Sequence, residues 1–511
     1  MRDTSWTEVP GSEHIIDIGT RKQLFFDDEI IETHRWITPH PSKSAALLVE
    51  TPEETDALHR AESERGTDVS AGIPGHVLMG THHVRRTQHR PVKHPGNPIV
   101  TRDRPWEGPS AEQWRIMNPF VMFDEEEESW KMWYGTLGGL EGGGDDAKGD
   151  LANVGCFTLY ATSKDGIEWE KPDLGLVEFD GSAANNIVYK KDGVTYCYLV
   201  PNFVKDPHDA EPGKWRYKGF VKTKPDQSVA VSPDGLHWEI IGTFQRIGDE
   251  NVGFFYDRKN GLYVGFTRNL YRKPAYGRHT FPQLRTHRTY TTAFSKDLVH
   301  WSHPRQVLAP DRDDSMDAEF ETILGFCYEG LYLAVLGVNR RMDGFGNASD
   351  NQLAYSRDGL HWERMSERKS FMVPDPDAGW EELTNQPSCF VVRDDRIYIY
   401  YTGFTLRGDH ACESIGLATL RLDGFVSLDG IKRKGQDSKG LPYQSTLLTR
   451  PLWSTGNRLV VNAETKEYIT AELTDPDGRV IPGFGQADCD AFTGDSIRHA
   501  FSWKGREDIG G

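Results

Sequence analysis

The residues best suited to acid–base chemistry in this 511-residue chain stand in two short acidic runs. Asp317-Ala318-Glu319-Phe320-Glu321 carries a carboxylate at every second position, which places all three on one face if the run is a strand. Its apolar neighbours make Glu319 hard to explain as solvated surface, whereas Asp249 in Gly248-Asp249-Glu250-Asn251 could equally cap a turn. Two carboxylates that meet in an apolar site can act as proton donor and acceptor, because burial and repulsion separate their pKa values.

A repeated motif indicates which elements must hold these acids. The pattern A-x-S-x-D-[G/L]-[I/L/V]-[E/H]-W occurs four times, and a degenerate copy keeps the Ala, the Asp-Gly and an aromatic residue. The leading alanines are Ala161, Ala230, Ala293, Ala354 and Ala418, a spacing typical of a repeat architecture. In each copy Ala-x-Ser would end a strand, Asp-Gly would turn the chain, and the Trp would pack against the sheet as a return strand begins.

A hairpin is expected upstream of each copy, because an apolar strand, a polar turn and a β-rich strand follow one another. The five predicted hairpins span 118–134, 186–199, 251–266, 319–334 and 385–401. A hairpin, the strand of the motif and its return strand make a four-stranded unit. Five such units predict an all-β fold with a five-bladed β-propeller over residues 95–430, in which the four motif tryptophans pack between strands.

Two segments flank the predicted propeller. Residues 1–94 form an N-terminal extension with a strand at 23–31 and a helical insertion at about 51–65, where Thr51-Pro52-Glu53-Glu54 has the features of a helix start. We expect this helix to cover the funnel or a subunit contact. Residues 446–511 alternate as short strands and predict a small C-terminal β-sandwich.

Composition narrows the possible partners. The formal net charge of −18 argues against nucleic acid or an anionic membrane as partner. No apolar run reaches transmembrane length, the start lacks a signal peptide, and the six cysteines contain no C-x-x-C pair, so we expect a cytoplasmic protein with reduced cysteines. No metal site or cofactor is expected, although the Gly-rich segment 138–149 leaves a structural calcium ion open. The sequence is also compatible with a homo-oligomer.

The propeller pattern resembles the five-bladed glycosidase superfamily, which includes glycoside hydrolase families 32, 43, 62, 68, 117 and 130. The segments that carry the likeness to a largely uncharacterised bacterial branch are Leu24-Phe25-Phe26-Asp27-Asp28, Lys131-Met132-Trp133-Tyr134, the repeated turns and residues 415–428. The resemblance implies a glycosidase that acts on small oligosaccharides or glycosides. A furanosidase-like activity is one of the activities that it allows. It also implies two carboxylates at the mouth of a central funnel, where innermost strands start.

On that resemblance we assign Glu319 as general acid, because a Glu has long reach and burial beside Phe320 would keep it protonated. The first blade, which in the family usually donates an Asp, here has Asn118-Pro119, similar to the Asn-Pro that family 130 uses for sugar contacts. Asp249 is therefore assigned as the ionised partner, with Asp28 in reserve. The expected substrate-binding residues are Asn118, Glu321, Glu381, Glu382, His410, Arg268 and Arg288.

Two alternatives remain at this stage. A non-catalytic glycan-binding propeller is compatible with the missing first-blade Asp. A sialidase-like hydrolase is suggested because S-x-D-G-x-x-W resembles the Asp box, although that class needs three clustered arginines at the funnel floor. An acid pair in the funnel would distinguish a glycosidase from a binding protein.

Overall fold

The computed structural model describes residues 15–32, 35–36, 78–79, 81, 83–108, 114–136, 156–191, 197–203, 211, 213–223, 227–243, 250–272, 286–315, 318–340, 349–365, 367–407, 410–431, 445–475 and 478–510. The predicted helix at 51–65, the Gly-rich segment 138–149 and Asp249 lie outside these residues. The chain forms two compact units, one of Met1–Thr87 with Val426–Gly511 and one of Gln88–Phe425.

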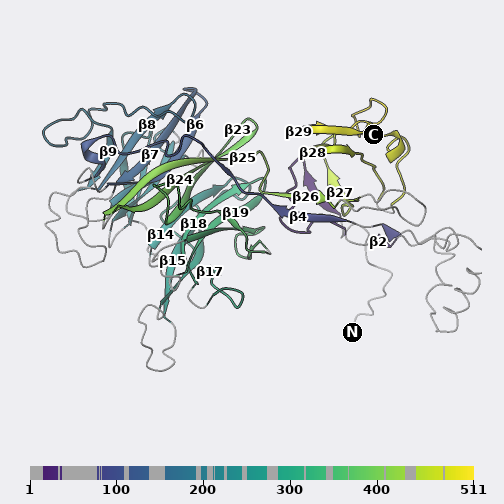
Figure 1. Ribbon diagram of the computed structural model, residues 1–511, viewed down its shortest axis with the longest axis horizontal. Helices are drawn as coiled ribbons and strands as arrows, with labels where there is room; N and C mark the ends of the chain where they lie inside the picture. The colour runs from purple at the N-terminus through teal and green to yellow at the C-terminus, as the bar shows by residue number, and fades with distance from the viewer. Residues whose placement is uncertain are drawn as a thin grey trace, which may run out of the picture. The chain divides into compact units, whose positions relative to one another are not determined.

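Among its described elements the Gln88–Phe425 unit is all-β apart from the short 3₁₀ turn η2 (Pro105–Glu107) (Figure 1). Three antiparallel sheets follow the chain order strand by strand. Their strands are β10 (Cys197–Phe203), β11 (Tyr217–Thr223), β12 (Gln227–Ser232) and β13 (Glu239–Thr243); β14 (Glu250–Asp257), β15 (Leu262–Arg272), β16 (Thr286–Ser295) and β17 (Arg305–Leu308); and β18 (Ala318–Tyr328), β19 (Leu331–Arg340), β20 (Ser349–Ser356) and β21 (Trp362–Arg364), with β22 (Ser370–Met372) also on β20.

The first and last strands of this unit share one eight-stranded sheet. Its members are β23 (Thr384–Arg393), β24 (Arg396–Arg407), β25 (His410–Arg421), β6 (Trp114–Asp124), β7 (Ser129–Thr136), β8 (Cys156–Ser163) and β9 (Ile187–Lys191), with β5 (Val92–Lys93) paired to β25. Strands β25 and β6 run parallel and pair Cys412 with Trp114 and Glu413 with Arg115. The two ends of the unit are therefore joined by backbone pairing.

The predicted hairpin at 186–199 is wrong, because β9 pairs with β8 as an outer strand and not with β10. Ile187 is fully buried in the same core cluster as Leu159 of β8. The side-chain amide of Asn186 donates to the Tyr160 carbonyl (2.8 Å) and helps to hold β9 there. A short apolar run has the same composition whether it becomes an inner or an outer strand, so the pattern could not distinguish the two.

The repeated turns are formed as the motif predicts. In the first copy the Ser163 hydroxyl accepts the Gly166 N–H (2.8 Å), and Asp165 Oδ1 accepts the N–H groups of Ile167 (2.8 Å) and Glu168 (2.9 Å). Gly166 has a φ of 77°, which favours glycine. Burial alone would raise the pKa of the Asp165 carboxyl, but these backbone N–H groups and the Ser163 hydroxyl lower it below its ordinary value.

Each of the four repeated turns packs on an aromatic side chain from the second strand of a neighbouring hairpin. Trp133 Nε1 of β7 donates to the Gly235 carbonyl in the second turn (2.7 Å), and Tyr400 Oη of β24 donates to the Gly166 carbonyl in the first turn (2.8 Å). The third and fourth turns meet their neighbours through the ring pairs Phe220–Trp301 (6.2 Å) and Phe266–Trp362 (5.4 Å). The first turn thus packs on the last hairpin of the unit.

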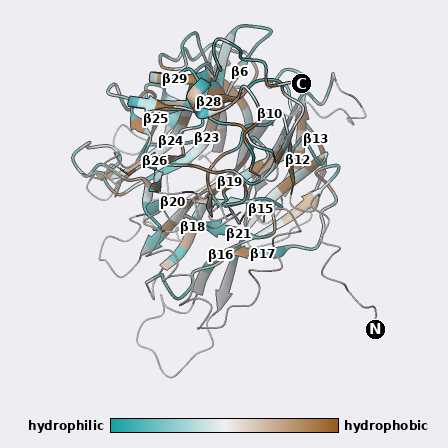
Figure 2. Cartoon of the chain, turned by 90° about the vertical axis from the view of Figure 1, so that its right-hand side faces the viewer, coloured by the Kyte–Doolittle hydropathy of each residue, from teal (hydrophilic) through white to brown (hydrophobic). Residues whose placement is uncertain are grey.

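The cores between the sheets are made of alternating apolar side chains. Several strands carry hydrophobic stretches, coloured brown in Figure 2. Phe320 and Leu336 of the β18–β21 sheet are fully buried and belong to the same core cluster as Phe255 and Phe266 of the β14–β17 sheet. The first strand of the former sheet carries a β-bulge between Phe320 and Thr322. Bulges also occur near the starts of β6, β14 and β23. A bulge changes which side chains share a face, and such changes are frequent near functional sites.

The other unit pairs strands from both ends of the chain. These are β1 (Ile16–Gly19) with β27 (Leu452–Ser454), β2 (Arg35–Trp36) with β3 (Leu78–Met79), β4 (Val84–Gln88) with β26 (Val426–Gly430), and β28 (Val460–Ile469) with β29 (Phe492–Ala500). Its C-terminal part has a small core that includes Phe484, Phe492, Phe501 and Trp503. The C-terminal β-sandwich stays a prediction.

The strand predicted at 23–31 is not formed. These residues make turns, and only Ile31 makes a bridge, to Thr449. The Glu29 N–H donates to Asp27 Oδ1 (3.0 Å), which closes a local turn. Acidic side chains that bond their own backbone in this way compete with strand pairing.

Candidate functional site

The start of β18 carries a cluster of opposite charges. Glu319 is 2 % exposed, and its Oε1 lies 3.6 Å from Arg288 Nη1 of β16 in the neighbouring sheet. The same nitrogen forms an ion pair with Glu321, whose other oxygen lies 3.4 Å from Arg268 Nη1 of β15. The two glutamates predicted to share a face therefore converge on one guanidinium group.

Local structure explains how these side chains are placed. Glu321 is the extra residue of the bulge between Phe320 and Thr322, and its carbonyl accepts the hydroxyl of the fully buried Tyr290 (2.8 Å). Tyr290 and Arg288 belong to the same strand, β16, so one strand fixes both the backbone and the carboxylate of Glu321.

The surroundings of Glu319 differ from the apolar setting that we expected. Phe320 points to the opposite face and lies in the core, because side chains alternate along a strand. Glu319 instead has the Arg288 guanidinium beside it.

Glu381 and Glu382 precede β23 and have different surroundings. Glu381 is 2 % exposed, and Lys93 Nζ of β5 lies 2.7 Å from its Oε1, while Asn385 Nδ2 lies 3.2 Å from its Oε2. Burial raises the pKa of the Glu381 carboxyl, although the Lys93 ammonium and the Asn385 amide oppose this shift. Glu382 is exposed and accepts the Thr405 hydroxyl. Glu381 thus anchors the short strand β5.

The remaining predicted site residues lie in several places. Asn118 is half-buried at the bulge of β6, with a φ of 51°, and its N–H donates to Thr402 Oγ1 (2.9 Å). His410 begins β25, where it pairs with Arg407. Asp28 belongs to the other unit, where it is exposed and pairs with Arg86. Since Asp249 lies outside the described residues, the predicted Glu319–Asp249 pair stays a prediction.

A second charge pair, which sequence reasoning missed, lies where β25 meets β6. Arg115 Nη2 is 2.7 Å from Glu413 Oε1, and the Glu413 side chain is 7 % exposed. The position of Glu413 in the repeat was the signal that the sequence offered. Arg288 stands five residues before the repeat alanine Ala293, and Glu413 stands five residues before Ala418. Arg288 and Glu413 each form an ion pair with a residue on the first strand of the neighbouring hairpin. In the first pair the arginine comes from the third strand, and in the second pair the glutamate does.

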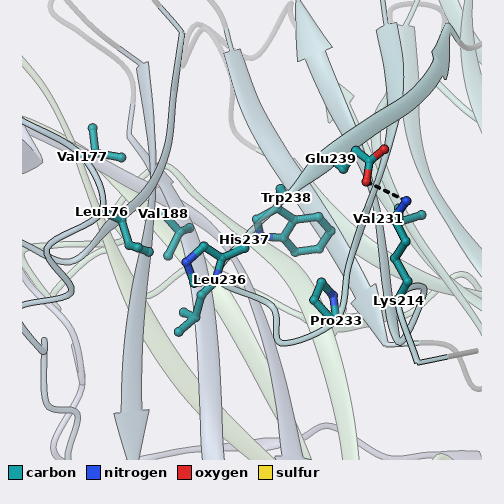
Figure 3. A pocket seen from close by; sticks show the side chains of 10 residues that line it. All are labelled: Leu176, Val177, Val188, Lys214, Val231, Pro233, Leu236, His237, Trp238 and Glu239. Carbon is teal, nitrogen blue, oxygen red and sulfur yellow. Dashed lines mark ion pairs between the residues drawn. The ribbon is translucent and has the colours of Figure 1, made fainter.

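An apolar pocket of about 420 Å³ lies elsewhere, at the turn end of the strands (Figure 3). Leu176, Val188, Leu236 and Trp238 line it, and Lys214 and Glu239 form an ion pair of 2.9 Å at its edge. None of its lining residues is a buried carboxylate.

The described residues contain no group of three or more His, Cys, Asp or Glu side chains arranged to hold a metal ion. Cys327, Cys389, Cys412 and Cys489 have free thiols, and burial raises the pKa of the Cys327 thiol to about 11. Within the same part of the chain no helix has the length and hydropathy needed to cross a membrane.

No protein-family model and no curated protein matches this chain. Among solved structures it is similar to an N-acetylgalactosamine deacetylase from F. plautii in complex with blood group B trisaccharide (TM-score 0.44, 12 % identity, 65 % of this chain and 95 % of that one). It is also similar to a β-1,2-mannobiose phosphorylase from Listeria innocua (0.42, 14 %, 65 % and 98 %). A third is a glycosyl hydrolase from Bacteroides ovatus (0.39, 15 %, 71 % and 97 %). At these TM-scores the likeness assigns no chemistry to this chain.

Proposed function

We propose that the Gln88–Phe425 unit is a five-bladed β-propeller that hydrolyses glycosides, with Glu319 as general acid. The observation that carries the proposal is the buried Glu319, which lies beside Glu321 and two arginines at the start of a first strand. Hydrolysis of a glycoside needs one carboxyl group that donates a proton and a second that acts as base or nucleophile.

The ring arrangement is supported by the contacts between sheets. Aromatic residues from the second strands β7, β11 and β15 pack on the repeated turn of the next sheet, and Tyr400 of the last hairpin packs on the first turn. Strand β5, which precedes the first hairpin, completes the last one by pairing with β25. Such a pairing of the unit's first strand with its last hairpin would close the ring, and the radial arrangement of a propeller leaves only short, protected sheet edges.

Glu319 can hold a proton without disrupting the cluster. Arg288 is engaged by Glu321, and its 3.6 Å separation from Glu319 is longer than a hydrogen bond. In the proposed mechanism Glu319 protonates the leaving-group oxygen, and Asp249 acts as the ionised carboxylate. Arg268, Arg288 and Glu321 would bind substrate hydroxyls, as would Asn118, Glu382 and His410, whereas both oxygens of Glu381 already have partners.

The test is the turnover of paired substrates by Glu319→Gln and Asp249→Asn. Loss of general acid catalysis should lower the kcat of Glu319→Gln on alkyl glycosides by 10²- to 10⁴-fold. The loss should be smaller on nitrophenyl glycosides, because nitrophenolate leaves without a proton. Glu168→Gln, a change of an exposed glutamate in the first repeated turn, is the matched control and should keep full activity.

Wild-type rates for both Glu319→Gln and Asp249→Asn would refute the assignment. Glycan binding by the wild-type protein without any turnover would favour the non-catalytic alternative, which the ion pairing of Glu319 keeps open. A sialidase-like enzyme would need a third arginine beside Arg268 and Arg288, and a loss of activity on sialosides in Arg288→Lys would support it.

A further inference from the structure

The two arginines beside Glu319 have side chains that are only partly buried. The Arg268 side chain is 16 % exposed and that of Arg288 is 21 % exposed, whereas the Glu319 side chain is 3 % exposed. A guanidinium group matches the geometry of a carboxylate, so two such groups at a glycosidase site would ordinarily select an anionic sugar. The charge specificity of the site therefore depends on which groups these two arginines already bind.

Glu321 binds both of them. Arg288 Nη1 forms an ion pair with Glu321 Oε2, and Arg268 Nη1 lies 3.4 Å from Glu321 Oε1. The backbone of Glu321 is held in place, because it is the extra residue of the β18 bulge and its carbonyl accepts the Tyr290 hydroxyl (2.8 Å). An anionic substrate would have to compete with this carboxylate for the arginines and would meet its negative charge, which is unfavourable.

We propose that Glu321 is a specificity-determining residue that reserves the site for uncharged glycosides, because it holds the guanidinium groups of Arg268 and Arg288. This inference rests on the proposed glycosidase function and names the substrate class of the same site. It agrees with the assignment of both arginines to substrate hydroxyls. It also argues against the sialidase-like alternative, in which arginines must bind the carboxylate of the substrate.

The experiment compares an uncharged substrate with its anionic analogue in the full-length chain. A panel of 4-nitrophenyl glycosides identifies the sugar that the wild type cleaves best, and the analogue has its primary hydroxyl group oxidised to a carboxylate. The wild type should favour the uncharged substrate by at least about 10-fold in kcat/KM. In Glu321→Gln the ratio of the anionic to the uncharged substrate should rise by about 10- to 100-fold, the range expected when a charged group gains a hydrogen bond.

Glu239→Gln is the matched control, because it also removes one negative charge from an ion pair, the exposed pair with Lys214. The chain carries a formal net charge of −18, so the loss of any glutamate could weaken the general repulsion of an anion. Glu239→Gln measures that general contribution, and its substrate ratio should stay close to the wild-type value.

A wild type that cleaves the anionic analogue as fast as the uncharged sugar would overturn the proposal, and this result needs no variant to fold. An unchanged ratio in Glu321→Gln, or an equal rise in Glu239→Gln, would also overturn it. The proposed function would survive each of these results if Glu319→Gln still lowers kcat on alkyl glycosides. If the wild type cleaves no glycoside, the proposed function and this specificity both fail.

Discussion

Replacing Lys93 by Met should destabilise the Gln88–Phe425 unit in a pH-dependent way. Lys93 Nζ lies 2.7 Å from both Glu381 Oε1 and the Val373 carbonyl, and Glu381 is 2 % exposed. Removing one partner of a buried pair costs about 3–5 kcal/mol because a charge remains buried. The Lys93 side chain is 26 % exposed, and Glu381 keeps the bond from Asn385, so we expect the lower end, about 3 kcal/mol at pH 8.

The sign of the pH dependence follows from Glu381. Burial already raises the pKa of this carboxyl, and loss of the Lys93 ammonium raises it further. A carboxyl group whose folded pKa exceeds its unfolded value destabilises the fold above the folded pKa, and this cost is relieved as the pH falls through that value. The difference between wild type and Lys93→Met should therefore shrink on acidification.

Urea unfolding of Lys93→Met between pH 8 and pH 5 measures this difference. Adding Glu381→Gln to Lys93→Met should recover much of the stability, since no charge is then left buried. Lys214→Met is the control, because its pair with Glu239 is 40 % and 58 % exposed and the change should leave the stability nearly unaltered. A Lys93→Met variant as stable as wild type, or a difference that does not change with pH, would refute the reasoning.

Two further predictions concern the repeated turns. Gly235→Ala should destabilise by about 2–4 kcal/mol, because its Cβ would lie 2.5 Å from Trp133 Cζ2 at a φ of 79°. Gly175→Ala, with φ 71° and no atom within 4 Å, should cost only about 1–2 kcal/mol in the same unfolding assay. Burial alone would raise the pKa of Asp234, but backbone N–H groups and His237 lower it to about 2. Asp234 thus stabilises the fold above its unfolded pKa near 4, and about 1 kcal/mol should be lost from pH 4 to pH 2 in the wild type but not in Asp234→Asn. An equally acid-sensitive variant would contradict this.

The repeated turns were predictable because their chemistry is local. Ser163, Asp165 and Gly166 bond one another and the next few backbone N–H groups, so the motif alone specifies the turn. The shared face of Glu319 and Glu321 was also predictable, although the bulge that brings both to Arg288 was not. Local pattern thus identified the acidic strand but not the detail of its backbone.

The pairing partners of the strands were harder to predict from the sequence than the turns. The 187–191 segment and the 23–31 segment both read as strands, yet one joined a different partner and the other made turns. Pairing depends on which edge is available and on whether an acid such as Asp27 bonds its own backbone. Neither condition is encoded in the alternation of apolar residues.

By itself the sequence determined an all-β chain of repeated units and the acidic start of one strand. The tertiary structure alone decided which charges meet, because Arg115 and Glu413 are separated by nearly 300 residues and face each other only where β25 runs beside β6. It also decided which carboxylates have a partner for each oxygen, as in Glu381. The physical reason is that hydrogen-bond satisfaction of a buried group depends on neighbours from distant strands, whereas strand and turn formation depend on the next few residues.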